Sequence, residues 1–296
     1  MSKGLLDPKV DFVFKNIFGS PNHPEILISF LNATLKAKKK IVNVDIKKTD
    51  IEKQYIEDKY SRLDVKATTS NDEIINIEIQ LKNENNMVKR SLYYLSKMYE
   101  EQLNEKEDYS KLVRTVCINI LNFKYLKTDN FHTGYRFKEI ESNEELTDIM
   151  EVHFIEIPKL QDSSDEKDML VAWTEFLKDP ESEKVRGLEL SIEEIRQAKD
   201  ELIRMSNDST QRELYDMRAN SLRDKMSELN AAERKGIEKG REEGSEEGRK
   251  EGRKEGIEEG RKEEKIKIAR NMKLSGLDTN TIAKVTNLSE DEIDKL

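Results

Sequence analysis

The chain has 296 residues, enough for one sizeable domain plus an extension. Charged residues make up 38% and hydrophobic residues 35%, which is too polar for one compact globule, so part of the chain must be solvated helix or linker. The net charge of −9 gives no global argument for nucleic-acid binding, which would need a local basic patch or a metal.

Cysteine usage and hydropathy restrict where the protein acts. The single cysteine, Cys117, excludes an internal disulfide framework and suits a reducing cytosol, and its apolar surroundings favour a core position over a nucleophile. Residues 1–15 scatter charges among apolar residues, unlike a signal peptide. No run approaches the roughly 20 apolar residues of a membrane span. We therefore expect a soluble, cytoplasmic protein without a membrane partner.

The N-terminal region predicts helices. Residues 7–20 have an apolar face, and Asp11 and Lys15, four residues apart, share a face if the segment is helical. The simplest interpretation of that pair is a surface ion pair worth about 0.3–0.5 kcal/mol. Residues 25–35 predict an amphipathic helix. The basic cluster at 36–40 is explained by the helix dipole, with a phosphate-backbone contact as the alternative.

A strand is predicted at 41–46, and residues 61–82 predict two further strands joined by a polar turn. Apolar and polar residues alternate in both, so each strand has one apolar and one polar face. If both apolar faces meet one core, the register favours a three-residue loop centred on Asn71 or Asp72. Such a loop places Asp64 opposite Glu78 or Gln80.

Two carboxylates at that distance repel unless something positive joins them. Mg²⁺ is a natural partner, because it binds one or two carboxylates together with water and phosphate oxygens. The alternative is a solvated sheet face that happens to carry an Asp and a Glu. The alternation leaves both interpretations open, because it is typical of any half-buried strand.

The next segments complete a mixed sheet. Residues 83–104 predict a helix, and the nearly continuous apolar run 112–123 predicts a buried strand that pairs in parallel through that helix. Edge strands are expected at 135–140 and 152–157, and a helix at 165–177 carries Trp173 as a packing residue. On the 83–104 helix the apolar positions are Met87, Leu92, Leu95, Met98, Tyr99 and Leu103, with Arg90, Tyr93, Tyr94 and Lys97 at the sides.

The C-terminal third is charged and repetitive. Glycine recurs every fourth residue from Gly236 to Gly260, between Glu, Lys and Arg, and this charge excludes membrane-helix packing. A long solvated helix and a flexible linker both remain open, and a partner helix could approach the glycine stripe. Residues 265–296 predict three short helices, the last with a capping box of Ser289 and Glu292. This helix-turn-helix unit could read DNA or serve packing and oligomerisation.

The hairpin residues carry a resemblance to a known family. The motifs resemble the PD-(D/E)XK nuclease superfamily, and more closely the Rpn family of recombination-promoting nucleases and transposases. The core resemblance covers residues 5–160. The residues that carry it are Arg62 to Ala67, then Ile77-Glu78-Ile79-Gln80, the opening Asp11 to Lys15 with Phe18-Gly19, Ser91 to Tyr94, and the glycine-and-charge repeat with its terminal helical unit.

The resemblance implies an α/β fold: a restriction-endonuclease-like core, a mixed sheet flanked by helices, with a long charged helical C-terminal extension. On this interpretation the domains are a nuclease-like domain at 1–180, a helical extension at 181–232, the glycine repeat at 233–264 and a small helical unit at 265–296. The implied activity is Mg²⁺- or Mn²⁺-dependent hydrolysis of DNA phosphodiester bonds.

The resemblance also assigns the site. Asp64 and Glu78 would ligate the metal, with help from the main-chain carbonyl of Ile79. Gln80 stands where the superfamily usually has Lys; the Rpn-like group is known for Glu-x-Gln, and Gln orients water without adding positive charge. Lys66 or Lys15 could supply that charge. Asp11 matches the opening motif and is expected to border the site.

Three functions compete. The first is a metal-dependent DNA endonuclease of the mobile-element type. The second is a catalytically inactive protein of the same fold that acts in nucleic-acid binding or assembly. The third is a scaffold that works through its charged tail. The expected partners are DNA and a second copy of the chain, joined through the C-terminal helical region. Metal dependence separates the first function from the others, and a steep salt dependence of DNA binding separates the second from the third.

Overall fold

The computed structural model describes residues 4–37, 39–47, 65–83, 85–165 and 167–296. They form two compact units, residues 1–224 and 225–296, and each unit is described by itself. The first unit contains a sheet, six helices and the start of a seventh within the described residues. Its helices are α1 (Asp11–Phe18), α2 (Pro24–Leu35), α3 (Met87–Glu100), α4 (Met169–Lys178), α5 (Glu183–Glu189) and α6 (Glu193–Asn207), with the start of α7 (Ser209–Leu274).

The sheet of the described residues has the order β1-β2-β3-β4-β6-β5. β1, β2 and β3 are antiparallel neighbours, β4 is parallel to both β3 and β6, and β5 is antiparallel to β6. This is the mixed sheet that the sequence predicts. The strands are β1 (Val44–Lys47), β2 (Val65–Thr69), β3 (Ile74–Gln80), β4 (Thr115–Leu121), β5 (His132–Lys138) and β6 (Glu145–Glu156).

The prediction of two edge strands after β4 was half wrong. β5 lies at the edge, but β6 lies inside the sheet, between β4 and β5, and its second half is buried. β6 is longer than expected because its first half extends into a hairpin with β5. The interior position of β6 is not predictable from the sequence, because no local feature of a strand specifies which strands it pairs with.

The central hairpin has the predicted three-residue loop, Ser70 to Asp72, centred on Asn71. The Thr69 amide donates to the Glu73 carbonyl at 2.9 Å, and Asp72 closes the turn with φ of 61°. Asp tolerates this left-handed conformation better than most residues. Val65 lies opposite Ile77, so the apolar side chains of both strands share one face, as predicted.

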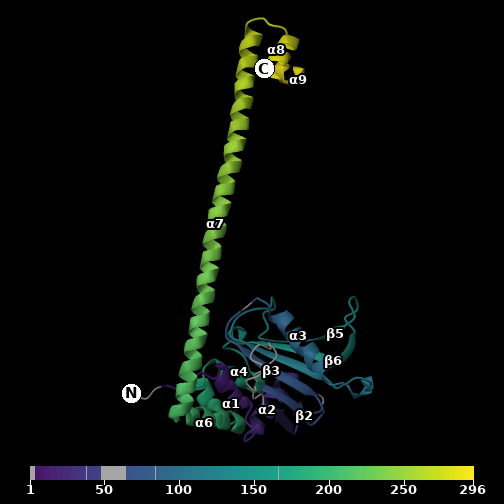
Figure 1. Cartoon of the computed structure of the whole chain (residues 1–296), viewed down its shortest axis with the longest axis vertical. Coiled ribbons are helices and arrows are strands. Elements are labelled where there is room, and N and C mark those ends of the chain that lie inside the picture. Colours follow the sequence, from purple (N-terminus) through teal and green to yellow (C-terminus); the bar gives the residue numbers. More distant parts are fainter. Residues whose placement is uncertain (1–3, 38, 48–64, 84, 166) are drawn as a thin grey trace. The chain divides into compact units, whose positions relative to one another are not determined.

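That apolar face forms the main core. Figure 1 shows α1, α2, α4 and α6 gathered beside the sheet, away from α3. Trp173 is fully buried there, packs edge-on against Phe18 and Phe176, and donates from Nε1 to Ser29 Oγ at 3.2 Å. The expectation that Trp173 is a packing residue is confirmed. β4 is buried throughout, Cys117 included, as predicted for a central parallel strand.

Helix α3 covers the opposite face of the sheet and is shorter than the predicted 83–104. Its buried stripe is Met87, Ser91, Tyr94, Leu95 and Met98. Leu92, expected on the inward side, is 49% exposed, and Tyr94, expected at the side, is buried. The position of this stripe explains why Leu92 is exposed. At 100° per residue, Leu92 lies about 140° around the helix axis from Met87, which is in the buried stripe.

The second unit consists of the rest of α7 with α8 (Thr279–Thr286) and α9 (Glu290–Asp294). α7 is continuous through the glycine repeat and ends before Gly276, whose φ is +83°. α9 begins with the predicted capping box, in which Ser289 and Glu292 each bond the backbone of the other. Ala269, Ile282, Leu288 and Ile293 form a small core, so the three helical segments pack as one unit.

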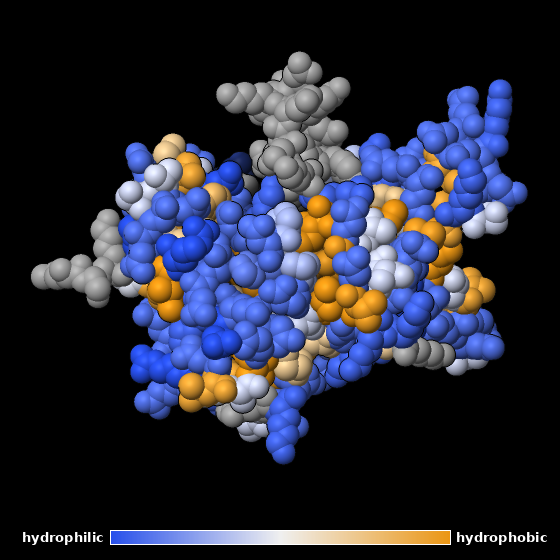
Figure 2. Space-filling model, turned by 90° about the horizontal axis from the view of Figure 1, so that it is seen from below, coloured by the Kyte–Doolittle hydropathy of each residue, from blue (hydrophilic) through white to orange (hydrophobic). Residues whose placement is uncertain are grey.

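On the face that Figure 2 shows, hydrophobic residues are interspersed with hydrophilic ones. None of the helices in the described part of the chain is long and apolar enough to cross a membrane.

Candidate active site

Glu78 is the central residue of the candidate site. It lies near the end of β3 on the face covered by α3, and its side chain is 1% exposed. Burial raises the pKa of Glu78 above its ordinary value, and this shift is opposed by the charge of Arg90 and by a hydrogen bond from Asn76. The alternative of a solvated sheet face is therefore wrong at this position. A carboxylate placed here needs a partner, because burying an unpaired charge is costly.

Asn76, two residues before Glu78, is fully buried on the same face. Its Nδ2 donates to Glu78 Oε1 at 3.4 Å and lies 4.0 Å from Cys117 Sγ. Burial, reinforced by the nearby charge of Glu78, raises the pKa of the Cys117 thiol to about 12. Cys117 therefore stays a neutral thiol and is no nucleophile, as the sequence indicates.

Two more buried polar residues, Ser91 on α3 and Asn119 on β4, lie between α3 and the sheet. Ser91 Oγ donates to Asn119 Oδ1 at 2.9 Å, and Asn119 Nδ2 donates to the His153 carbonyl at 3.1 Å. All of these side chains are buried. Buried polar groups need hydrogen-bond partners, so this network fixes where α3 sits over β3 and β4.

Arg90, in the first turn of α3, provides the positive charge. Its Nε lies 3.3 Å from Glu78 Oε2, and its guanidinium carbon lies 5.4 Å from the centre of the Tyr94 ring. Because α3 is the crossover between β3 and β4, its N-terminal turn follows the end of β3 that carries Glu78. The fold thereby brings together two residues twelve positions apart in the chain.

The other residues predicted for the site, where the structure describes them, lie at different places in the fold. Asp64 lies outside the described residues, so its position opposite Glu78 or Gln80 stays a prediction. Lys66 pairs across the hairpin with Asn76, so it shares the sheet face of Glu78, and its Nζ lies 3.9 Å from Glu101 Oε2. The Gln80 carbonyl accepts a hydrogen bond from the Asn122 amide at 2.9 Å, while Ile79 packs in the main core.

Asp11 and Lys15 belong to α1, which packs on the other face of the sheet. Asp11 Oδ2 accepts a hydrogen bond from Arg218 Nη1 at 2.9 Å, on the first-unit part of α7. The basic cluster 36–40 follows α2, and the Lys39 carbonyl accepts a hydrogen bond from Asn71 in the hairpin loop. The loop lies at the start of β3, so Lys39 is at the opposite end of the strand from Glu78.

The residues present fit a hard cation in part. Glu78 Oε2 and Asn76 Oδ1 are buried oxygens that accept no hydrogen bond from the described residues. Oxygen atoms of this kind suit Mg²⁺ or Mn²⁺. The described residues contain no group of three or more His, Cys, Asp and Glu side chains arranged for a metal ion. A metal ion at Glu78 would thus find one carboxylate among the described residues and would need a second one.

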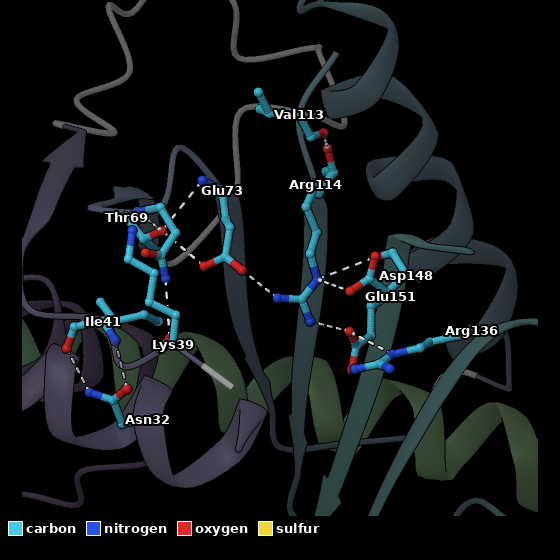
Figure 3. Close-up of polar contacts among 12 residues, drawn as sticks. Asn32, Lys39, Ile41, Thr69, Glu73, Val113, Arg114, Arg136, Asp148 and Glu151 are labelled. Atoms are coloured by element: carbon cyan, nitrogen blue, oxygen red, sulfur yellow. Dashed lines mark hydrogen bonds and ion pairs between the residues drawn. The ribbon is translucent and has the colours of Figure 1, made fainter. Parts of the chain in front are cut away.

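A second polar network crosses the sheet at the other end of β3. Figure 3 shows Arg114 between Glu73 and Glu151, with Arg136 on the far side of Glu151. The side chains of Glu73, Arg114 and Glu151 are 8%, 14% and 4% exposed, so the ion pairs are largely removed from water. Glu73 and Arg114 directly precede β3 and β4, and Glu151 lies within β6, so the ion pairs tie these three strands together on the main-core side.

Two histidines continue this network toward the edge of the sheet. His153 Nε2 lies 2.7 Å from Glu151 Oε1, and His153 Nδ1 lies 2.9 Å from His132 Nε2. Burial, followed by the charge of His153, lowers the pKa of His132 to about 4. Burial tends to raise the pKa of Glu151, but hydrogen bonds from His153 and Arg114 hold it at about 2.

Acid should therefore destabilise the first unit. The unfolded chain binds a proton at His132 near pH 6.5 and the folded chain only near pH 4, so stability falls as pH drops through this window. Between pH 6.5 and 5 the loss reaches up to about 2 kcal/mol. Urea denaturation at pH 7 and pH 5 measures it. His132→Gln should lose less stability than the wild type, and His23→Gln should lose the same amount; equal losses for all three would contradict the assignment.

The sheet order, the flanking helices and the Glu-x-Gln sequence of β3, with its buried Glu78, define the class of PD-(D/E)XK nuclease folds. A scan against family models agrees. Residues 8–232 match the PD-(D/E)XK nuclease family transposase, and residues 262–296 match the C-terminal HTH domain of the Rpn/YhgA-like nuclease family. The chain belongs to this family of PD-(D/E)XK transposase-like nucleases, in its Rpn branch. Searches of curated proteins and of solved structures found no significant match.

Sequence reasoning missed Arg90 and Asn76 as parts of the site. Asn76 had a usable signal, because it stands two residues before Glu78 and must share its sheet face. Asn119 had another, as a polar residue within the apolar run of β4, where a buried polar group needs an explanation. Arg90 had no such signal in the sequence apart from its charge, because its approach to Glu78 depends on how α3 crosses the sheet.

Proposed function

We propose that this protein is a metal-dependent DNA endonuclease that hydrolyses phosphodiester bonds, of the recombination-promoting, transposase-like type. The family assignment supports a nuclease, and the buried Glu78 carboxylate is the observation that carries the proposal. A buried carboxylate is hard to explain by stability alone, because an apolar residue would pack at this position with a lower desolvation penalty. Binding of a divalent cation would explain why an acid stands there.

Asp64 and Glu78 are the proposed ligands, with the main-chain carbonyl of Ile79 as a third. Asp64 directly precedes Val65, and Val65 lies opposite Ile77, the neighbour of Glu78. When bound, Mg²⁺ or Mn²⁺ would lower the pKa of a coordinated water and neutralise charge on the phosphate. Gln80 would orient the water by hydrogen bonding, and Lys66, which shares the sheet face of Glu78, would face the phosphate. Lys15 is not proposed for this role, because α1 packs on the other face of the sheet.

A second candidate is an inactive nuclease fold that serves nucleic-acid binding or assembly. The observation in its favour is the charge distribution of the HTH unit. α9, the third helical segment, carries Glu290, Asp291, Glu292 and Asp294. Acidic side chains repel a phosphate backbone, so α9 is poorly suited to enter a DNA groove. Assembly into a homo-oligomer through the C-terminal helical region fits this unit better. The proposed location is the cytoplasm, which suits the single reduced Cys117.

Cleavage of supercoiled plasmid DNA by the purified full-length protein tests the first candidate. We expect nicked and then linear DNA with Mg²⁺ or Mn²⁺, and none with a chelator. If DNA is bound but not cut with either metal, the second candidate replaces the first. Binding measured over a range of salt concentrations then shows how many phosphates are neutralised, since the logarithm of affinity falls linearly with the logarithm of salt.

A further inference from the structure

The Glu78–Arg90 pair occupies the place where a metal should bind. Arg90 Nε approaches Glu78 Oε2, the carboxylate oxygen that accepts no hydrogen bond from the described residues. The other oxygen, Oε1, already accepts from Asn76. Oε2, beside Arg90, is therefore the carboxylate oxygen with more lone-pair capacity left for a cation.

Arg90 has a second contact that holds it near the site. Its guanidinium carbon lies 5.4 Å from the centre of the Tyr94 ring, one turn further along α3. A guanidinium over an aromatic face is attracted by the ring quadrupole, and this attraction remains when the carboxylate is engaged elsewhere. The Arg90 side chain is 22% exposed, against 1% for Glu78, so it leads from the buried acid toward solvent.

A guanidinium and a divalent cation cannot share one carboxylate oxygen without strong repulsion, which is poorly screened in a buried site. Resting on the proposed function, we infer that Arg90 is the resident counter-ion of the metal site. A divalent cation binds Glu78 by displacing Arg90, and the displaced guanidinium then faces the DNA phosphate. Arg90 thus supplies the positive charge that the Gln80 position lacks.

This role differs from that of a structural salt bridge in one measurable way. A structural partner keeps Glu78 ionised and in place, so its removal should weaken metal binding. A competing counter-ion opposes the metal, so its removal should strengthen metal binding. Arginine also binds phosphate in a two-pronged geometry, which a displaced Arg90 can use.

Mn²⁺ titration by calorimetry on the full-length protein at pH 8 tests the inference without any cleavage reaction. Arg90→Met should bind Mn²⁺ more tightly by about 10-fold or more. Arg90→Lys should stay near the wild type, because it keeps the charge. Lys89→Met, which removes an exposed positive charge from the adjacent position of α3, is the matched control and should not change affinity.

Unchanged or weaker Mn²⁺ binding by Arg90→Met overturns the inference and leaves the proposed function intact. If neither the wild type nor Arg90→Met binds Mn²⁺, the proposed metal site itself fails. Should Arg90→Met not fold, Arg90→Gln gives the same test, because its amide can still donate to Glu78 without a charge. Plasmid cleavage adds a second readout: Arg90→Met should cut more slowly despite its tighter metal binding.

Discussion

Glu78→Gln should lose metal-dependent plasmid cleavage by at least about 10²–10³-fold, the largest effect on activity that we expect from one substitution. The change keeps the volume of the side chain and its hydrogen bond with Asn76 but removes the negative charge that a divalent cation needs. Initial nicking rates at saturating Mg²⁺, followed by agarose gel electrophoresis, give the ratio to the wild type.

The control for this experiment is Glu100→Gln, which removes one exposed acid from the last turn of α3. It should cut DNA at the wild-type rate. Circular dichroism of both variants checks that they are folded, because the Glu78 substitution removes the carboxylate that lies 3.3 Å from Arg90 Nε. Nicking by Glu78→Gln at the wild-type rate would remove Glu78 from the chemistry and favour a contaminating nuclease or another site.

Arg114→Met should lower the free energy of unfolding by about 3–5 kcal/mol, the largest effect on stability that we expect outside the apolar core. The substitution leaves Glu73 and Glu151 buried without the guanidinium that lies between them (Figure 3). Glu151 keeps Arg136 and His153, but Glu73 keeps only a hydrogen bond from Thr69 among the side-chain contacts described. Urea denaturation at pH 7 measures the loss.

Arg196→Met is the comparison, because its ion pair with Glu193 on α6 is more than half exposed. Exposed pairs are worth about 0–1 kcal/mol. Similar losses in both variants at pH 7 would mean that water reaches the Glu73–Arg114–Glu151 network.

Local sequence was sufficient for the elements whose cause is local. Alternation of apolar and polar residues predicts β2 and β3. The need to keep both apolar faces on one side of the sheet, together with the turn-forming residues between the strands, predicts their three-residue loop. The Ser289–Glu292 capping box and the stop at Gly276 involve residues that are neighbours in the chain, and both are present. The motif resemblance to the Rpn family is confirmed by the family matches over both regions.

Contacts between segments that are distant in the sequence determined the strand order, the burial of Glu78 and the ion-pair network. Sequence cannot tell which strand lies beside β4, so β6 was expected at an edge although it is interior. The polar face of β3 could have been solvated, and only the crossing of α3 buries Glu78 and brings Arg90 to it. Likewise, Glu73, Arg114 and Glu151 are unremarkable in the sequence and form a network only because the parallel register of β3, β4 and β6 brings them side by side. Backbone pattern is a local property, whereas burial, charge pairing and the composition of a site depend on which surfaces the fold brings together.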